Sequence, residues 1–259
     1  MSDIAFFDAH VAVGPRKVIF PGQDWAPRDV FARLAECGIT ESLVYHTAAV
    51  EDSPVTGNAM LMDVLRDPAV RHGPKVHPVW ALLPFTTREQ GTPAELCRAL
   101  KENGVKAVLV YPAAQAFSGA EWCSGALYRL LETMRMPTFV RHSPADYSWS
   151  ELHDLLVAHP RLPVILRNVS YAIDRSVYAL LEQCPNLSLE TAKYLPFRGI
   201  EEVVRRFGPE RLVFGSEAPF LSPGAAVTPI LTAAVSDADR RMIAADNLRR
   251  LVGGITYDA

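Results

Sequence analysis

The amino-acid sequence predicts a single α/β domain, a (β/α)8 or TIM barrel that spans residues 1–259. Three observations support this prediction. Short, nearly continuous apolar runs recur along the chain, as expected for parallel strands that are covered on both faces. A polar segment and then an amphipathic helical stretch follow most of these runs. The length of 259 residues also suits one barrel of this type.

Eight apolar runs are predicted to be the strands of the barrel. They are residues 6–13, 42–46, 79–83, 107–111, 138–142, 164–168, 187–191 and 212–215. A doubly wound open sheet is the alternative architecture, but it would normally carry a glycine-rich phosphate-binding loop after an early strand. Neither GxGxxG nor GxxxxGK[ST] occurs in the sequence. The barrel is therefore favoured.

Capping residues mark several of the helices between these strands. The sequence Thr92-Pro93-Ala94-Glu95 is a capping box with proline at the first helical position, and Gly104 ends the helix. A second capping box, Ser148 to Glu151, begins a helix that ends before Pro160. Further helices are predicted from Asp24 or Trp25 to Gly38 and over residues 124–136, 174–184 and 199–208.

Composition and charge exclude several classes of function. The chain is 49% hydrophobic and 21% charged with a net charge of -3, which is typical of a globular domain and gives no basic surface for nucleic acid. No apolar run reaches the roughly 18 residues that a membrane span needs, and the N-terminus does not resemble a signal peptide. The four cysteines form no CxxC pair. We expect a cytoplasmic protein that acts on a small molecule, with no nucleic-acid or membrane partner.

Polar residues gather where the predicted strands end, which is the end of a barrel that carries chemistry. They are Asp8 and His10, Tyr45 and His46, Tyr111, Arg141 and His142, Arg167 and Asn168, Glu190 and Lys193, and Glu217. The opposite ends of the strands carry fewer residues of the types that take part in catalysis or binding. This asymmetry indicates a functional site at the carboxyl ends of the strands.

Five segments resemble the amidohydrolase superfamily. FFDAHVAVG is similar to its opening D-x-H-x-H strand, MPTFVRHSP to its fifth strand and RLPVILRNVS to its sixth. FGPERLVFGSEAPF resembles the eighth-strand segment, and AADNLRRLVG the closing one. The resemblance covers nearly the whole chain and is to the amidohydrolase-related branch that includes aminocarboxymuconate-semialdehyde decarboxylase and benzoate-type decarboxylases. It implies a (β/α)8 barrel, and it makes a homodimer the expected oligomeric state.

The sequence departs from this family at the positions that bind metal. Members hold a divalent ion with two first-strand histidines, a fifth-strand histidine and an eighth-strand aspartate. The corresponding residues here are His10, Ala12, His142 and Glu217. The sixth-strand histidine is replaced by Asn168, and the fourth-strand lysine and histidine by Leu109 and Tyr111. The resemblance therefore excludes a binuclear site bridged by a modified lysine.

One interpretation is an enzyme with a single metal ion, zinc being the favoured metal. His10, His142 and Glu217 would form a His₂Glu ligand set with water in the fourth position. The metal would polarise a carbonyl group and lower the pKa of its bound water.

A second interpretation is an enzyme without a metal on the same barrel. Glu217 would then act with His10 and His142 as acid and bases, because imidazoles titrate near neutral pH. Arg141, Arg167 or Lys193 would bind a substrate carboxylate. Because side chains alternate along a strand, Arg141 and His142 are expected to face opposite ways.

The function expected from both interpretations is hydrolysis of a small carbonyl compound such as a lactone, a cyclic amide or a related acid. Decarboxylation of an aromatic or unsaturated acid is an alternative, and a non-catalytic binding relative is another. The predicted catalytic residues are Glu217, His142 and His10, and the predicted substrate-binding residues are Asn168, Tyr111, His46, Arg141 and Arg167.

Simpler roles are expected for other polar residues. Asp8 is expected to brace the first turn, and Glu190 to pair with Lys193. Asn58 is expected to cap a helix near the barrel mouth. His72, His77, His153 and His159 are expected on the surface or on helices. Loops at 14–24, 47–60 and 113–124 are expected to shape the pocket.

Overall fold

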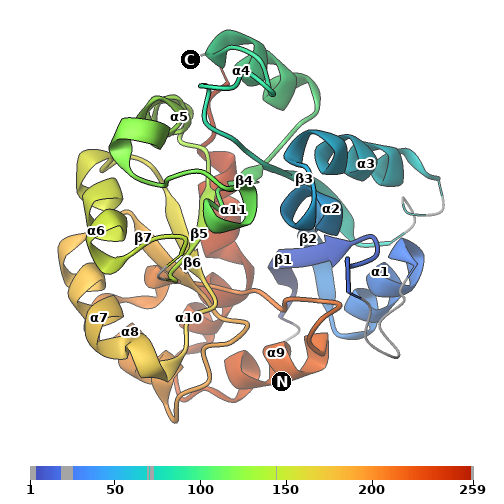
Figure 1. Ribbon diagram of the computed structural model, residues 1–259. Helices are drawn as coiled ribbons and strands as arrows, with labels where there is room; N and C mark the ends of the chain where they lie inside the picture. The colour runs from blue at the N-terminus through green and yellow to red at the C-terminus, as the bar shows by residue number, and fades with distance from the viewer. Residues whose placement is uncertain (1–3, 19–25, 69, 71–72, 144, 258–259) are drawn as a thin grey trace.

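Eight parallel strands form one sheet in which each strand pairs with the next one in the sequence (Figure 1). The computed structural model describes residues 4–18, 26–68, 70, 73–143 and 145–257. The strands are β1 (Phe6–Val13), β2 (Ile39–His46), β3 (Lys75–Ala81), β4 (Ala107–Leu109), β5 (Thr138–Arg141), β6 (Val164–Arg167), β7 (Leu187–Glu190) and β8 (Leu212–Val213).

The last strand meets the first and completes the barrel. The backbone N–H of Ala9 donates to the carbonyl oxygen of Phe214 at 2.9 Å, and that of Ala12 to Ala218 at 2.8 Å. Val11 and Ala218 also form a parallel bridge. The predicted (β/α)8 barrel is confirmed, and the ends of β8 and β1 are brought together at its mouth.

Helices surround the barrel (Figure 1). Those that follow the predictions within a few residues are α1 (Pro27–Glu36), α4 (Pro93–Glu102), α5 (Glu121–Met134), α6 (Trp149–Ala158), α7 (Asp174–Gln183) and α8 (Gly199–Phe207). The expected start of the first helix, Asp24 or Trp25, lies outside the described residues. Both predicted capping boxes, at Thr92 and Ser148, are formed.

Other helices were not predicted. They are α2 (Thr47–Glu51), α3 (Pro54–Arg66), α9 (Pro223–Thr232), α10 (Asp237–Arg241), the π-helix Met242–Asp246 and α11 (Asn247–Gly253). Three short 3₁₀ turns span Ala113–Gln115, Tyr171–Ile173 and Pro209–Arg211. None of the helices in the described part of the chain is long and apolar enough to cross a membrane.

Asn58 lies inside α3, so its predicted role as a helix cap is wrong. Ser53 caps this helix instead. The buried Asn58 amide bonds to both the N–H and the carbonyl of Ala81 at 2.9 Å, and so ties α3 to the end of β3. A buried amide must find such partners, and here the strand backbone supplies them.

The buried apolar residues form two layers, one on each side of the strands. Alternate strand residues fill the barrel interior, among them Leu43, Leu109, Phe139, Ile165 and Val213. Their sequence neighbours point outward and pack under the helices, as Val44, Val108, Val140, Leu166 and Leu212 do. This alternation decides which residue at each strand end faces the barrel axis.

Candidate functional site

A polar cavity of about 280 Å³ opens at the carboxyl ends of the strands. Tyr45, Tyr111, Asn168 and Phe220 contribute to its wall. The charged residues that line it are Arg16, Glu51, Arg141, Arg167, Lys193 and Glu217. With four cations and two carboxylates, the lining carries a formal charge of +2.

Strand alternation explains why these particular side chains reach the cavity. Tyr45 lies two residues beyond Leu43, which fills the barrel interior, and Tyr111 stands in the same relation to Leu109. Arg141 and Arg167 likewise follow the interior residues Phe139 and Ile165 by two. The strand ends therefore aim two phenols and two guanidinium groups at the barrel axis.

Three of the four cations at the cavity are neutralised by carboxylates. Arg16 Nε lies 2.9 Å from Glu51 Oε1, and Lys193 Nζ lies 2.8 Å from Glu217 Oε1. Arg141 Nε lies 2.5 Å from Oδ2 of the buried Asp146. These pairs hold the side chains in place but leave little net charge for a ligand.

Arg167 is the exception. Its side chain is buried, yet no carboxylate among the described residues lies within ion-pairing distance of it. The guanidinium donates to the hydroxyl of Tyr111 and lies 5.4 Å from the ring centre of Tyr45, while its Nε has no hydrogen-bond partner in the described part of the chain. Glu190 and Glu217 act on its charge only from beyond ion-pairing distance, and a buried charge without a direct counter-ion is costly, which makes Arg167 a candidate binding site for an anion.

Three buried titratable residues lie together within β1 and at the end of β7. Oδ1 of Asp8 accepts the backbone N–H groups of His10 and Ser216 at 2.9 Å each, so Asp8 does brace the first turn. His10 Nδ1 lies 3.5 Å from Oε2 of Glu190. The other oxygen of Glu190 accepts the N–H of Ala192 at 2.7 Å.

Burial shifts the pKa of each of these groups in the direction that favours its uncharged form. It raises the pKa of Asp8 to about 7 and also raises the pKa of Glu190. Burial, reinforced by the charge of Arg167, holds the pKa of His10 well below its usual range. Burial therefore favours the neutral imidazole of His10, which is the form that accepts a proton.

Several buried polar atoms around this group lack a hydrogen-bond partner among the described residues. They are Oδ2 of Asp8, both ring nitrogens of His10, Oε2 of Glu190, Oε2 of Glu217 and Nε of Arg167. Buried polar atoms in folded proteins are nearly always satisfied by protein, water or ligand. Their concentration here is typical of a site that binds a polar molecule.

The backbone is strained at two positions of the cavity wall. Asn168 and Glu217 follow β6 and β8 with φ angles of 59° and 56°, in the left-handed region. Asparagine tolerates this conformation, whereas glutamate adopts it at a cost in free energy. Such strain is common at functional sites, and here it directs the Glu217 side chain to the cavity.

The structure does not assemble the predicted His10, His142 and Glu217 ligand set. β5 ends at Arg141, and it is Arg141 rather than His142 that lines the cavity. The His142 ring stacks on Trp149 at 3.6 Å between centres, and its Nδ1 lies 2.9 Å from the carbonyl oxygen of Tyr147. Arg141 and His142 face opposite ways, as expected for neighbours along a strand, and His142 is therefore turned away from the cavity.

Two further expectations need correction. His46 does not line the cavity, because its Nδ1 accepts the backbone N–H of Ala48 at 3.1 Å and caps α2. Lys193 pairs with Glu217 and not with Glu190, which turns inward to His10. The remaining predicted substrate-binding residues, Asn168, Tyr111, Arg141 and Arg167, all line the cavity.

Sequence reasoning missed Arg16, Glu51 and the inward position of Glu190. Arg16 and Glu51 come from two of the three segments expected to be pocket-shaping loops, but residues 47–60 are largely helical and Glu51 ends α2, so the expected loop there is wrong. Glu190 could have been found, because it lies two residues beyond Ser188 on a strand whose apolar residues, Leu187 and Leu189, face outward.

A (β/α)8 barrel with a polar cavity at the carboxyl ends of its strands has the architecture of a barrel enzyme. A family model described as amidohydrolase matches residues 7–254, so the chain belongs to the amidohydrolase family. The family resemblance found in the sequence is thereby confirmed. No curated protein sequence matches the chain.

Solved structures of the same fold include decarboxylases and a proposed hydrolase. 5-Carboxyvanillate decarboxylase from Sphingomonas paucimobilis is 12% identical, with a TM-score of 0.68 over 98% of this chain and 100% of that one. A proposed 2-pyrone-4,6-dicarboxylic acid hydrolase from Pseudomonas putida is 16% identical, with a TM-score of 0.66 over 97% and 98%. Dihydroxybenzoic acid decarboxylase from a Polaromonas species, solved with bound manganese and 2-nitroresorcinol, is 16% identical, with a TM-score of 0.63 over 96% and 97%.

The donor set of this chain does not fit a metal ion of the kind bound by the Polaromonas protein. Within the described residues, no group of three or more His, Cys, Asp or Glu side chains is placed to hold one. Ala12 offers no donor atom, His142 faces away, and an oxygen of Glu217 is held by Lys193.

Proposed function

We propose that the protein is a hydrolase that opens a small lactone or cyclic amide carrying at least one carboxylate group. The observation that carries this proposal is Arg167, a buried guanidinium with no carboxylate partner among the described residues and with an unsatisfied Nε at the cavity wall. A substrate carboxylate supplies the missing counter-charge, and the planar guanidinium suits it well.

His10 is the proposed base for water. Nδ1 of the neutral ring lies 3.5 Å from Oε2 of Glu190, and Nε2 has no hydrogen-bond partner among the described residues, so Nε2 is available to accept a proton. Water attacks the substrate carbonyl carbon and gives its proton to Nε2. The bond between that carbon and the ring oxygen or nitrogen then breaks, and the proton passes to the leaving atom. His10 is buried and does not itself line the cavity, but the charges of Arg167, Lys193 and Glu217 lie near enough to act on its pKa.

The comparisons support this reaction class without deciding it. The family is one of amidohydrolase-like enzymes, and one similar structure is that of a proposed dicarboxylic acid hydrolase whose substrate is a carboxylated lactone. Decarboxylation is the second candidate, because two further similar structures are those of decarboxylases, whose substrates are also carboxylic acids.

Turnover of paired substrates tests the proposal. Carboxylated lactones and cyclic amides, 2-pyrone-4,6-dicarboxylate among them, are compared with their methyl esters, and ring opening is followed by absorbance and proton release. We expect the free acids to be opened and the esters to react at least about a hundredfold more slowly, as expected when a buried charge pair is lost. His10→Gln is expected to lower kcat more than it raises KM.

Other products of the same panel would overturn the proposal. Release of CO₂ without ring opening establishes the decarboxylase alternative. Faster reaction of the methyl esters than of the acids would show that Arg167 does not bind a substrate carboxylate. No turnover of any member, together with tight binding of the acids, supports a non-catalytic binding protein.

A further inference from the structure

Lys193 occupies the point where three strand ends of the barrel converge. It follows β7, whose neighbours in the sheet are β6 and β8. Its Nζ lies 3.3 Å from Oδ1 of Asn168, just after β6, and 2.8 Å from Oε1 of Glu217, after β8. The ammonium therefore bridges the two positions at which relatives are expected to carry a histidine and a metal-binding aspartate.

The turn that carries Lys193 is well anchored. The N–H of Tyr194 donates to the carbonyl of Thr191 at 3.1 Å, and the hydroxyl of Thr191 accepts the N–H of Gly215 beside β8. Tyr194 is buried, and its hydroxyl lies 3.0 Å from that of Tyr178. These contacts fix the backbone on both sides of Lys193, and the bonds to Asn168 and Glu217 hold its ammonium at the strand ends.

The hydrogen-bonding capacity of Lys193 leaves room for a ligand. An ammonium group has three N–H donors. Two of them meet Asn168 and Glu217, and the structure records no partner for the third within the described part of the chain. Lys193 also lines the cavity, with 40% of its side chain exposed. Its third N–H is available to an oxygen atom of a bound substrate.

We propose that the ammonium of Lys193 takes the place of the family's divalent cation, so that this side chain is the resident positive charge of the site. A positive charge 2.8 Å from Glu217 Oε1 repels a second cation from that carboxylate. It also supplies what a metal would otherwise give to a substrate oxygen, a fixed positive charge that stabilises developing negative charge. The inference rests on the same cavity as the proposed function.

Binding of Mn²⁺ alone, measured by the loss of the electron paramagnetic resonance signal of the free ion, tests this proposal without any substrate. The wild-type protein is expected not to bind one equivalent. Lys193→Met removes the charge, keeps most of the side-chain length and frees the oxygens of Asn168 and Glu217, so the weak association of Mn²⁺ with this carboxylate is expected to tighten at least about tenfold. The added change Glu217→Gln is expected to abolish that gain.

The matched control is Lys75→Met at the opposite end of the barrel. Lys75 Nζ lies 2.9 Å from Glu41, a carboxylate about as exposed as Glu217, so the change removes a comparable ion pair. It is expected to leave Mn²⁺ binding unchanged. Lys193→Gln serves as a second variant, and circular dichroism checks the fold of each.

Each remaining outcome contradicts the proposal. Stoichiometric binding of Mn²⁺ by the wild type shows that the ion and the ammonium do not compete for one place. Failure of both Lys193 variants to gain affinity shows that Lys193 is not what excludes the ion. Neither result depends on turnover, so failure of this inference is distinguishable from failure of the proposed hydrolysis.

Discussion

Arg167 and Arg211 are both buried arginines, but their surroundings differ completely. The guanidinium of Arg211 donates to the carbonyl oxygens of Leu181, Cys184 and Pro185. Among the described residues Arg167 donates only to the phenol of Tyr111 and to no carbonyl oxygen, while Nε lacks a partner in both arginines. The first arginine therefore stabilises the fold, whereas the second is kept for a ligand.

This contrast predicts opposite effects of the same substitution. Arg167→Met removes an uncompensated buried charge, so we expect the free energy of unfolding to stay the same or to rise by about 1–4 kcal/mol. Arg211→Met removes the guanidinium donors from three carbonyl groups, and we expect it to destabilise the protein by at least about 2 kcal/mol. Urea unfolding of both variants measures the difference. Equal destabilisation by the two changes would show that Arg167 has only a structural role.

The buried carboxyl group of Asp8 is expected to make the free energy of unfolding depend on pH. Its pKa is about 7 in the folded protein, against an ordinary value of 3.8. Between these values the folded state holds a proton that the unfolded state has lost, so stability falls as the pH rises. The full difference between the two pKa values lowers the free energy of unfolding by roughly 4 kcal/mol once the pH is well above the folded-state pKa.

Asp8→Asn mimics the protonated carboxyl group and should remove this loss. We expect the variant to gain stability over the wild type as the pH rises from about 5 to 8, measured by urea unfolding at each pH. The exposed Asp154→Asn is the control, with no such trend expected. A difference between Asp8→Asn and wild type that is independent of pH contradicts the assignment.

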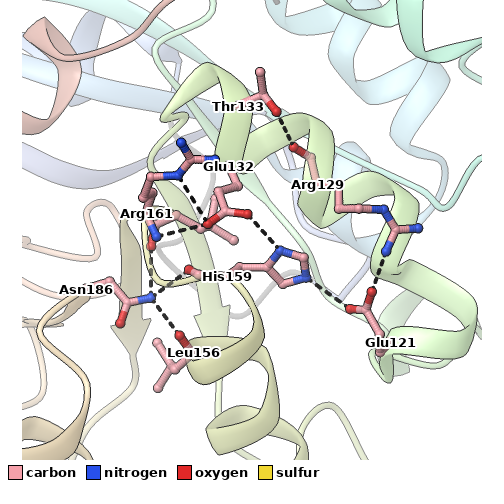
Figure 2. Close-up of polar contacts among 9 residues, drawn as sticks. Glu121, Arg129, Glu132, Thr133, Leu156, His159, Arg161 and Asn186 are labelled. Carbon is pink, nitrogen blue, oxygen red and sulfur yellow. Dashed lines mark hydrogen bonds and ion pairs between the residues drawn. The ribbon is translucent and has the colours of Figure 1, made fainter.

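At the scale of elements, a histidine joins α5 to the end of α6 away from the site (Figure 2). His159 Nε2 lies 3.0 Å from Glu121 and Nδ1 lies 3.2 Å from Glu132, both on α5. Glu132 also accepts the backbone N–H of Arg161. His159 is only 3% exposed and caps the C-terminal end of α6, so of the two predicted places, the surface or a helix, the surface is wrong. His77 also differs from its prediction, because it is half-buried on β3, and His72 lies outside the described residues.

His159→Ala removes both contacts and leaves Glu132 without its imidazole partner. We expect the free energy of unfolding to fall by about 1–3 kcal/mol. His153→Ala on α6 is the matched control, because His153 is exposed and is expected to change stability by less than about 0.5 kcal/mol. Similar effects of the two changes in urea unfolding would contradict the role given to His159.

The strands and capped helices could be predicted because their signals are local. Apolar runs gave the interior of all eight strands, and the capping boxes at Thr92 and Ser148 gave two helix starts. The residues at which strands end were harder to predict. Prediction extended the fifth strand to His142, whereas it ends at Arg141, and that one residue decides which side chain enters the cavity.

The pairing of charges could not be predicted in the same way. Asp8, His10, Lys193 and Glu217 were recognisable as residues at strand ends, but their partners depend on distances between strands that are far apart in the sequence. Lys193 pairs across two strand ends with Asn168 and Glu217, and Arg141 with Asp146 in the following loop. Such contacts depend on rotamers and loop paths, which no periodic pattern encodes.

For the whole molecule, barrel closure brings the site together. β1 carries His10, β7 carries Glu190, and the segment after β8 carries Glu217. The bonds from Ala9 and Ala12 to Phe214 and Ala218 place these elements side by side. The fold thus gathers an imidazole, carboxyl groups and cations at one mouth, as the family's barrel allows, with a donor set that does not fit its metal.

The most direct test of the central claim is calorimetric titration with small carboxylates that cannot be hydrolysed. Benzoate and benzene-1,3-dicarboxylate are compared with their methyl esters, for the wild type and for Arg167→Met. We predict that a free acid binds with one-to-one stoichiometry, that its ester does not, and that Arg167→Met weakens binding at least about a hundredfold. Equal binding of acid and ester, or equal binding by the wild type and Arg167→Met, would contradict a site built around Arg167 for an anionic substrate.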